Sequence, residues 1–295
     1  MDITEEARDI YRLEMHGKGG ARRLVAYFIA HGGGAVIDPG PTSALPGVLD
    51  GMKHLGMKGL ELVIPTHIHV DHGGGIGRLA ELFPDAKIVL HPLAVKHAVD
   101  PSRLIEGTKM AFGPDFELRY GPVLPVPKEA IVTPADGEAV LLGDRRLRVF
   151  HAPGHAPHHI AILEELTGGL FCGEALGVPS FDPEVPMPGA APPAFDPEVT
   201  METMEKLRAL RPSLLFYGHD GVGKAPDRLI AAAAQNVKAV GEALLPGFNA
   251  GEPMEALSDR YRRYVRERFG RDIEAQDGQM TVTAYAMYFK KRRPS

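Results

Sequence analysis

Side chains that could bind a metal are concentrated in one short segment of the sequence. Three histidines and one aspartate fall within six consecutive positions there, namely His67, His69, Asp71 and His72. Imidazole nitrogens and carboxylate oxygens are the ligands that zinc and similar divalent metals take in proteins. Because the desolvation of four such groups would be costly without a cation, the segment predicts a metal site.

A short strand and a helix must position this segment. Residues 62–64 read as a buried strand, which places the histidines at its C-terminal end. Several glycines follow and leave the chain free to curl around a common point. Apolar residues then recur with helical spacing over 76–83, until Pro84 ends the helix. The sequence therefore predicts a metal loop between a strand and a helix.

Other segments of the first half are predicted from turn chemistry and apolar runs. Residues 24–30 and 35–38 flank a glycine turn and predict a hairpin, which Asp38-Pro39-Gly40 closes with a second turn. Residues 88–90 predict a further strand. Residues 101–128 are rich in proline, glycine and charge, and we expect an irregular insertion there.

A second histidine cluster follows a predicted hairpin at 139–142 and 146–150. Its members are His151, His155, His158 and His159. His155 follows Pro-Gly at a strand end, and we expect it to be a metal ligand. The other three histidines are expected to line the pocket or to orient a ligand from behind.

Two later strand ends carry single candidates. The predicted strand pair 160–163 and 169–172 is followed by Glu174. The predicted strand 214–217 is followed by His219. Tyr217 ends that strand, where it either lines the pocket or belongs to the core. Ligand-type residues at successive strand ends predict one site at the edge of a sheet.

Together these motifs resemble those of the metallo-β-lactamase superfamily. The resemblance covers about residues 20–221. It is carried by His67-x-His69-x-Asp71-His72, by His155 in Pro-Gly-His, and by Glu174 and His219, each after a glycine. The resemblance implies an α+β fold, a four-layer αββα sandwich with a dinuclear metal site.

The domain organisation expected from this resemblance has two parts. Residues 1–225 would form the metal-binding domain, and residues 226–295 a C-terminal helical extension. Amphipathic patterns predict three helices in that extension, at 229–245, 254–269 and 281–290. Their arrangement after the metal domain resembles that of glyoxalase II-like hydrolases, in which helical residues help to hold a thioester.

The resemblance also implies a role for each candidate ligand. It assigns one metal to His67, His69 and His155, and the second metal to Asp71, His72 and His219. Glu174 stands where the family usually has a bridging aspartate, so its longer side chain would bridge both metals or bind only one. Asp71 would also be catalytic, by orienting the bridging hydroxide and passing a proton to the leaving group.

The chemistry expected of such a site is hydrolysis. Two metals about 3.5–4 Å apart can share a hydroxide whose pKa falls to about 7, and they polarise the substrate's carbonyl or phosphoryl oxygen. We expect two divalent metal ions, with zinc favoured and iron or manganese as alternatives. The leading hypothesis is a hydrolase that acts on a small ester, thioester or lactone.

Two other functions use the same fold. A phosphodiesterase would need a basic channel for nucleic acid, whereas this chain has a net charge of −5 with interspersed charges. A di-iron redox protein usually replaces the second histidine of the motif with a carboxylate, whereas His69 is intact here. Glu174 nevertheless adds a carboxylate that iron would accept.

The composition of the sequence limits the cellular compartment and the partners that we expect. The chain has 295 residues and one cysteine, Cys172, which excludes an intramolecular disulfide and suits a reducing compartment. The N-terminal residues lack a signal-peptide pattern, and no apolar run approaches the roughly 20 residues that span a bilayer. We therefore expect a cytoplasmic protein with a small-molecule substrate and neither a nucleic-acid nor a membrane partner. A homodimer is one option for its assembly.

Overall fold

The computed structural model describes residues 2–15, 23–113, 115–180, 185–273 and 275–292. The chain forms two units. The first unit comprises Met1–His151, His158–Gly173 and Pro212–Lys224, and the second comprises Ala152–Pro157, Glu174–Arg211 and Ala225–Ser295. The boundary expected between residues 225 and 226 from the sequence stays a prediction.

The first unit contains a seven-stranded sheet in the order β1-β2-β3-β4-β5-β6-β7. Strands β1 to β4 pair antiparallel, and β4 to β7 pair parallel. The predicted hairpin is β3 with β4, and the metal loop follows β5, whereas β1, β2 and β7 were not predicted. The strand bounds are β1 (Ile3–Ala7), β2 (Ile10–Met15), β3 (Leu24–Ile29), β4 (Ala35–Ile37), β5 (Leu62–Ile64), β6 (Lys87–Val89) and β7 (Ile131–Val132).

The second sheet of this unit has six strands in the order β15-β14-β11-β10-β9-β8. Only β11 and β14 pair parallel, and the other neighbours are antiparallel. All these strands except the two-residue β15 were predicted from the sequence. Their bounds are β8 (Ala139–Leu142), β9 (Arg145–His151), β10 (Ile160–Glu164), β11 (Gly169–Gly173), β14 (Leu214–Tyr217) and β15 (Val222–Gly223).

An apolar core joins the two sheets face to face. Tyr27 of β3 packs edge-on against Phe171 of β11, with ring centroids 5.4 Å apart, and also contacts Phe216 of β14. The Tyr27 hydroxyl donates a 2.8 Å hydrogen bond to the Tyr217 carbonyl, so its polar atom is satisfied within the core. This packing fixes the strand ends that carry the candidate ligands.

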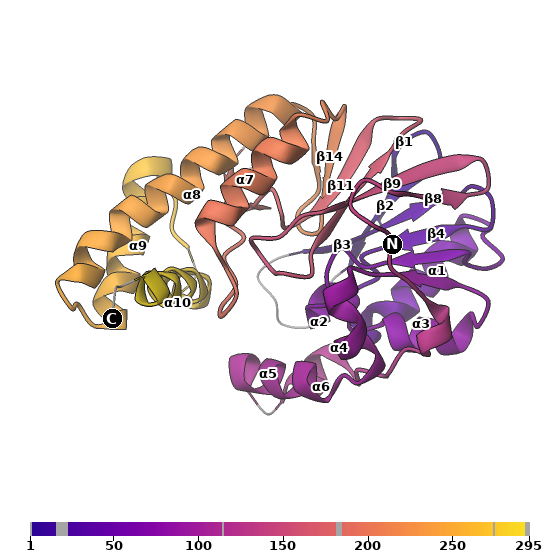
Figure 1. Cartoon of the computed structure of the whole chain (residues 1–295), viewed down its shortest axis with the longest axis horizontal. Coiled ribbons are helices and arrows are strands. Elements are labelled where there is room, and N and C mark those ends of the chain that lie inside the picture. The colour runs from indigo at the N-terminus through magenta and orange to yellow at the C-terminus, as the bar shows by residue number, and fades with distance from the viewer. Residues whose placement is uncertain (1, 16–22, 114, 181–184, 274, 293–295) are drawn as a thin grey trace. The chain divides into compact units, whose positions relative to one another are not determined.

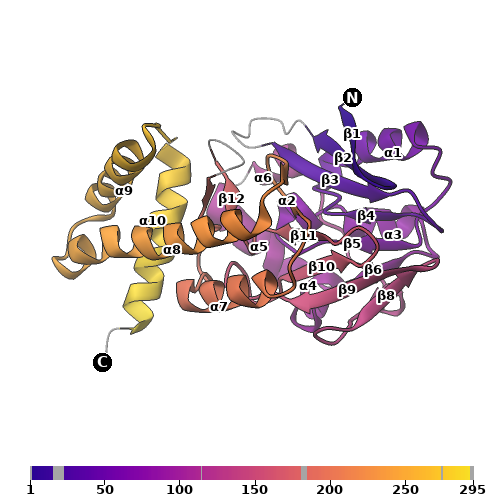
Figure 2. The ribbon, with the colours of Figure 1, turned by 90° about the horizontal axis from the view of Figure 1, so that it is seen from above.

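Helices cover the outer face of the seven-stranded sheet (Figures 1 and 2). Val48 of α1 and Leu79 of α3 belong to one buried cluster with Phe28 and Val63 of the sheet. The predicted helix at 76–83 is confirmed as α3. The elements on this side are η1 (Thr42–Ala44), α1 (Leu45–His54), α3 (Ile76–Leu82), η2 (Pro92–Ala94), α4 (Val95–Val99) and η3 (Lys128–Ala130).

The expectation of an irregular insertion at 101–128 was wrong. This segment contains two helices, α5 (Ser102–Phe112) and α6 (Phe116–Tyr120). Proline and glycine stand at the ends of these helices. Pro101 directly precedes α5, and a glycine with positive φ follows each helix, Gly113 (88°) after α5 and Gly121 (76°) after α6. Residues of this kind mark helix ends as readily as loops.

The second unit is mainly helical. Asp196 caps α7 by accepting hydrogen bonds from the Glu198 and Val199 backbone amides. The three helices predicted from the sequence appear as α8, α9 and α10, and the hydroxyl of Tyr285 donates to the Val237 carbonyl to join α10 to α8. The elements are β12 (Val178–Pro179), β13 (Pro186–Met187), α7 (Pro197–Arg208), α8 (Pro226–Asn249), α9 (Met254–Phe269) and α10 (Ala275–Arg292). None of the described helices is long and apolar enough to cross a membrane.

A buried histidine beyond β6 links stability to pH. His91 Nδ1 accepts a 3.0 Å hydrogen bond from the Leu93 amide, and its ring centroid lies 4.2 Å from that of His151. Burial and then the nearby His151 lower the pKa of His91 to about 4, although Asp136 opposes this shift. The folded state therefore disfavours the protonated imidazole.

We predict that His91→Asn weakens the acid sensitivity of the metal-free protein. A histidine in the unfolded chain has a pKa of about 6.5 and takes up its proton first, so folding stability falls as the pH drops from there toward 4. Asparagine keeps the acceptor for the Leu93 amide but does not titrate. As the pH falls from about 6.5 to about 4, the free energy of unfolding in urea should decrease by about 2 kcal/mol more for the wild type than for His91→Asn. An equal decrease in the free energy of unfolding of the wild type and His91→Asn would contradict the prediction.

Candidate metal centre

Two neighbouring parallel strands end at the base of the site. Because β4 and β5 pair in parallel, Asp38 and Thr66 follow their strands at the same sheet edge. The Thr66 backbone amide donates to Asp38 Oδ1 at 2.6 Å, and its hydroxyl donates to Oδ2 at 3.0 Å. Asp38 has φ of 48°, a left-handed conformation that aspartate tolerates better than most residues. The strand ends are thereby joined below the metal loop.

The metal loop folds its histidines toward one another. A short turn of helix, α2 (Val70–Gly73), follows His69, whose carbonyl accepts from the His72 amide at 3.0 Å. The ring centroid of His67 consequently lies 4.6 Å from that of His69 and 4.3 Å from that of His72. Sequence neighbours thus become spatial neighbours.

The strand β14 brings His219 to the same place. The Gly218 carbonyl accepts a 3.1 Å hydrogen bond from the Val25 amide of β3, which ties the two sheets together beside the site. A Cβ atom on Gly218 would lie only 2.5 Å from His72 Cε1. Glycine is therefore required before His219, because the His72 ring occupies the space of any side chain.

Three candidate ligands of the first unit converge. His72 Nε2 and His219 Nε2 lie 3.2 Å apart. Asp71 Oδ2 lies 3.7 Å from His72 Nε2 and 3.6 Å from His219 Nε2. Around a tetrahedral zinc ion with bonds of about 2.0–2.1 Å, ligand atoms lie about 3.4 Å apart. The donor set and its spacing therefore fit a divalent metal.

Buried hydrogen bonds orient two of the histidines. Asp38 is an acceptor, and its Oδ2 lies 3.2 Å from His72 Nδ1. The Thr66 hydroxyl, which donates to Asp38, lies 3.1 Å from His67 Nδ1 and can accept its proton. Both Nδ1 atoms are therefore placed to carry a proton, and both Nε2 atoms are left as ligands. This is the arrangement by which carboxylates orient metal-binding histidines.

The second unit contains one further pair of candidates. His155 Nε2 lies 3.0 Å from Glu174 Oε2, and both residues are buried. His155 Nδ1 lies 2.7 Å from the Gly189 carbonyl, which can only accept, so the proton belongs on Nδ1. His155 Nε2 and the Glu174 carboxylate thus form a pair of adjacent metal-type donors.

Two of the expected pocket residues contact the metal loop. The Ile160 amide donates to the Thr66 carbonyl at 2.7 Å and so places the start of β10 beside the loop. The His159 ring stacks on His67 with centroids 4.9 Å apart, and the His158 ring meets His69 edge-on at 5.7 Å. These contacts suit residues that hold the ligand rings in place.

The other two expected pocket residues lie apart from these rings. His151 pairs with His91, and its Nε2 lies 3.1 Å from the Pro134 carbonyl. Tyr217 is fully buried in β14, which agrees with the core interpretation of this residue. Burial raises the pKa of its phenol well above the ordinary value. A pocket role for His151 or Tyr217 stays a prediction.

Sequence reasoning missed Asp38 and Thr66. Asp38 was interpreted only as part of a turn, although an aspartate directly after an apolar strand is a signal for a buried, hydrogen-bonded carboxylate. Thr66 directly precedes the histidines and carried no signal of its own. Cys172 is fully buried and contacts the Phe216 carbonyl through Sγ at 3.3 Å, so it packs in the core.

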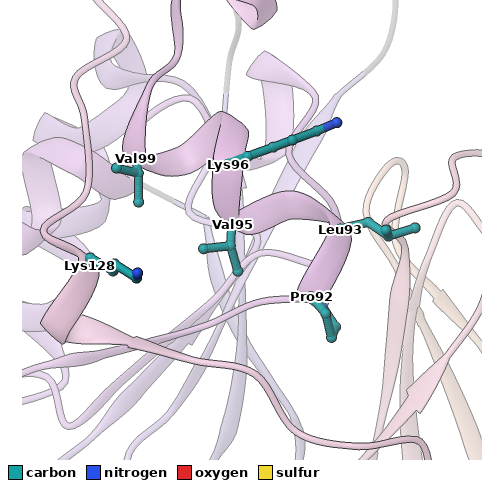
Figure 3. Close-up of a pocket in the computed structure, with 6 residues that line it drawn as sticks. All are labelled: Pro92, Leu93, Val95, Lys96, Val99 and Lys128. Carbon is teal, nitrogen blue, oxygen red and sulfur yellow. The ribbon is translucent and has the colours of Figure 1, made fainter.

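A surface groove of about 410 Å³ lies elsewhere in the first unit, along η2 and α4 (Figure 3). None of its lining residues is a histidine, cysteine, aspartate or glutamate. They are Pro92, Leu93, Val95, Lys96, Val99 and Lys128. The candidate metal ligands therefore lie in the histidine cluster and not in this groove.

Comparison with known proteins defines the family. The model of the metallo-beta-lactamase superfamily matches residues 19–219. A metallo-beta-lactamase fold-containing protein of Sulfurisphaera tokodaii is 25% identical over 166 residues, which cover 55% of this chain and 61% of that protein. A hydroxyacylglutathione hydrolase of Gloeobacter violaceus is 33% identical over 142 residues, which cover 48% of this chain and 43% of that protein.

A solved structure shows the same fold over nearly the whole chain. It is a metallo-beta-lactamase family protein from Thermus thermophilus, with a TM-score of 0.69, 21% identity, and coverage of 96% of this chain and 93% of that one. The chain belongs to the metallo-beta-lactamase superfamily, and the α+β fold expected from its motifs is confirmed. The aligned segments span less than two thirds of the curated relatives just named.

Proposed function

We propose that this protein is a metal-dependent hydrolase that acts on a small ester, thioester or lactone. The observation that carries the proposal is the convergence of Asp71, His72 and His219 within 4.8 Å of one another. Three metal-type donors at this spacing, one of them oriented by the buried Asp38, are suited to a resident cation.

The proposal assigns two metal ions to seven ligands. Zinc is favoured, with iron or manganese as alternatives, because imidazole and carboxylate accept all three. Glu174 directly follows β11, and His155 lies four residues after the end of β9, so both residues are close in sequence to strands of the first unit. The ligands proposed are His67, His69, Asp71, His72, His155, Glu174 and His219.

The reaction divides between the metals and the protein. When bound, two divalent ions supply a nucleophilic hydroxide at neutral pH and polarise the acyl oxygen. Asp71 is the most exposed member of its cluster, and its Oδ2 faces the two histidine nitrogens, so the other oxygen of its carboxylate would take up a proton and pass it to the leaving group. Asp38 keeps His72 in the tautomer whose Nε2 can bind a metal.

Similarity to a hydroxyacylglutathione hydrolase supports a thioester among the candidate substrates. The net charge of −5 and the interspersed charges favour a small molecule over nucleic acid. The single cysteine suits a reducing compartment such as the cytoplasm. A phosphodiesterase and a di-iron redox protein are the competing functions, and a substrate panel separates all three.

The test is turnover by the purified protein with thioesters, lactones and phosphodiesters, with and without a chelator. We expect hydrolysis of an acyl substrate that the chelator abolishes and that zinc, manganese or iron restores. Acyl hydrolysis that resists the chelator would refute the metal mechanism. Activity confined to phosphodiesters, or oxygen consumption with an electron donor in place of hydrolysis, would refute the acyl substrate class.

A further inference from the structure

The loop that carries His155 is hydrogen-bonded to α7, and both belong to the second unit. The Thr203 hydroxyl donates a 2.6 Å hydrogen bond to the Pro153 carbonyl, and the Asp196 amide donates a 2.9 Å bond to the Gly154 carbonyl. Thr203 is only 4% exposed, so water does not compete for its bond. The two residues that directly precede His155 are therefore held by α7.

Gly154 lets the backbone of this loop lie directly on the helix. Its φ of 129° is a conformation that glycine adopts far more readily than other residues. A Cβ atom on Gly154 would lie 2.6 Å from Thr200 Cα and 2.8 Å from the Thr200 amide nitrogen. No side chain fits between the loop and α7, so the surface of the helix sets the path of the loop.

The His155 ring is oriented by a different segment of the same unit. Its Nδ1 lies 2.7 Å from the Gly189 carbonyl, and its Nε2 lies 3.0 Å from Glu174 Oε2. A Cβ atom on Gly189 would lie 2.8 Å from the Glu174 carbonyl oxygen, so this segment packs closely around the pair. Gly189 thus fixes the direction of the ring, and α7 fixes the backbone from which the ring projects. A metal ligand needs both, because it must be held to within about 0.5 Å.

The hydrogen bond of Thr203 leads out of its own helix. A threonine inside a helix can donate to the carbonyl four residues earlier, as Thr200 does to the Asp196 carbonyl at 2.7 Å. The single hydroxyl proton of Thr203 goes instead to Pro153, in the loop. Threonine is also a weaker helix former than alanine or leucine. The hydroxyl of Thr203 therefore serves the His155 loop and not the helix.

We propose that Thr203 is a positioning residue for His155, and that α7 acts through it to set the affinity of the metal ion which His155 and Glu174 bind. This inference rests on the function proposed above, in which both residues are ligands. Thr203 touches neither metal nor substrate in this account, and it acts by holding the loop. Contacts behind a metal ligand typically change metal affinity about 10- to 100-fold.

The experiment compares Thr203→Val and Thr203→Ser with the wild type. Valine keeps the volume of threonine and removes the hydroxyl, whereas serine keeps the hydroxyl. In competition with a fluorescent zinc chelator, one of the two zinc ions should bind about 10-fold more weakly to Thr203→Val, and Thr203→Ser should restore the wild-type affinity. The visible spectrum of cobalt-loaded protein, which reports ligand geometry, should change in Thr203→Val alone. Melting of the metal-free variants checks that they fold, and Thr203→Ala, which should also weaken zinc binding, is the second variant.

Thr108→Val is the matched control, because it also removes a buried threonine hydroxyl. Thr108 is 8% exposed, and its hydroxyl donates a 2.8 Å hydrogen bond to the Leu104 carbonyl within α5. Its bond does not leave the helix, so Thr108→Val should keep the zinc affinity and the cobalt spectrum of the wild type.

The outcomes separate this inference from the proposed function. Equal zinc affinity of Thr203→Val and the wild type would overturn the role of Thr203, and so would a loss of affinity that Thr203→Ser does not restore. If the wild type binds two ions but hydrolyses no acyl substrate, the acyl-hydrolase function fails, and the zinc affinities still decide whether Thr203 positions His155. A wild type that binds neither zinc nor cobalt would overturn both proposals.

Discussion

Replacing His72 with alanine should lower the bound metal from about two equivalents to about one and reduce hydrolysis at least about 100-fold. His72 is fully buried, and its Nε2 lies 3.2 Å from His219 Nε2, so its loss removes the centre of the Asp71 cluster. It also leaves Asp38 without one of its partners. Elemental analysis and the rate of acyl hydrolysis measure the two effects.

The control for this substitution is His54→Ala. His54 is an exposed histidine near the end of α1 and has no metal-type neighbour within the groups identified in the described chain. It should leave the metal content and the hydrolysis rate at the wild-type values. If His72→Ala retained its full metal content, His72 could not be a ligand.

Replacing Asp38 with asparagine should weaken metal binding about 10- to 100-fold, although Asp38 itself binds no metal in this account. The carboxylate accepts from the Thr66 amide and hydroxyl and faces His72 Nδ1. Asparagine has the same shape, but its NH2 group replaces one of the two carboxylate oxygens with a hydrogen-bond donor. His72 Nδ1 then loses the acceptor that fixes the tautomer of His72. Competition with a fluorescent zinc chelator measures the change in affinity.

Asp50→Asn is the matched control for the loss of one carboxylate. Asp50 is exposed on α1, so the zinc affinity of the Asp50→Asn variant should equal that of the wild type. Thr66→Val should give a smaller loss than Asp38→Asn, because it removes only the hydroxyl that links His67 to Asp38. Unchanged zinc affinity in Asp38→Asn would show that the hydrogen bonds around Asp38 serve folding alone.

Sequence patterns identified the ligand-type residues of the first unit because these residues lie at the ends of strands. Apolar runs at 62–64 and 214–217 gave the strands, and the residues that follow them are His67 to His72 and His219. The parallel pairing of β4 with β5 then joins Asp38 to Thr66. That pairing follows from the path of the whole chain, which local spacing does not encode.

The remaining differences have similar causes. The helices α5 and α6 escaped prediction because proline and glycine were taken as signs of a loop, whereas here they bound short helices. The position of the end of α6 depends on hydrogen bonds from the Ser43 and Thr42 hydroxyls to the Arg119 and Pro122 carbonyls, which are more than 70 residues away in sequence. Contacts of this range become visible only in the folded chain.

The most direct test of the account is the metal content of the purified wild-type protein after incubation with zinc and removal of the excess. The proposed set of seven ligands predicts about two tightly bound ions per chain, because seven donors exceed what one tetrahedral ion takes. It also predicts that a chelator which removes them abolishes acyl hydrolysis. A protein that binds no zinc, iron or manganese at micromolar concentration would contradict the account.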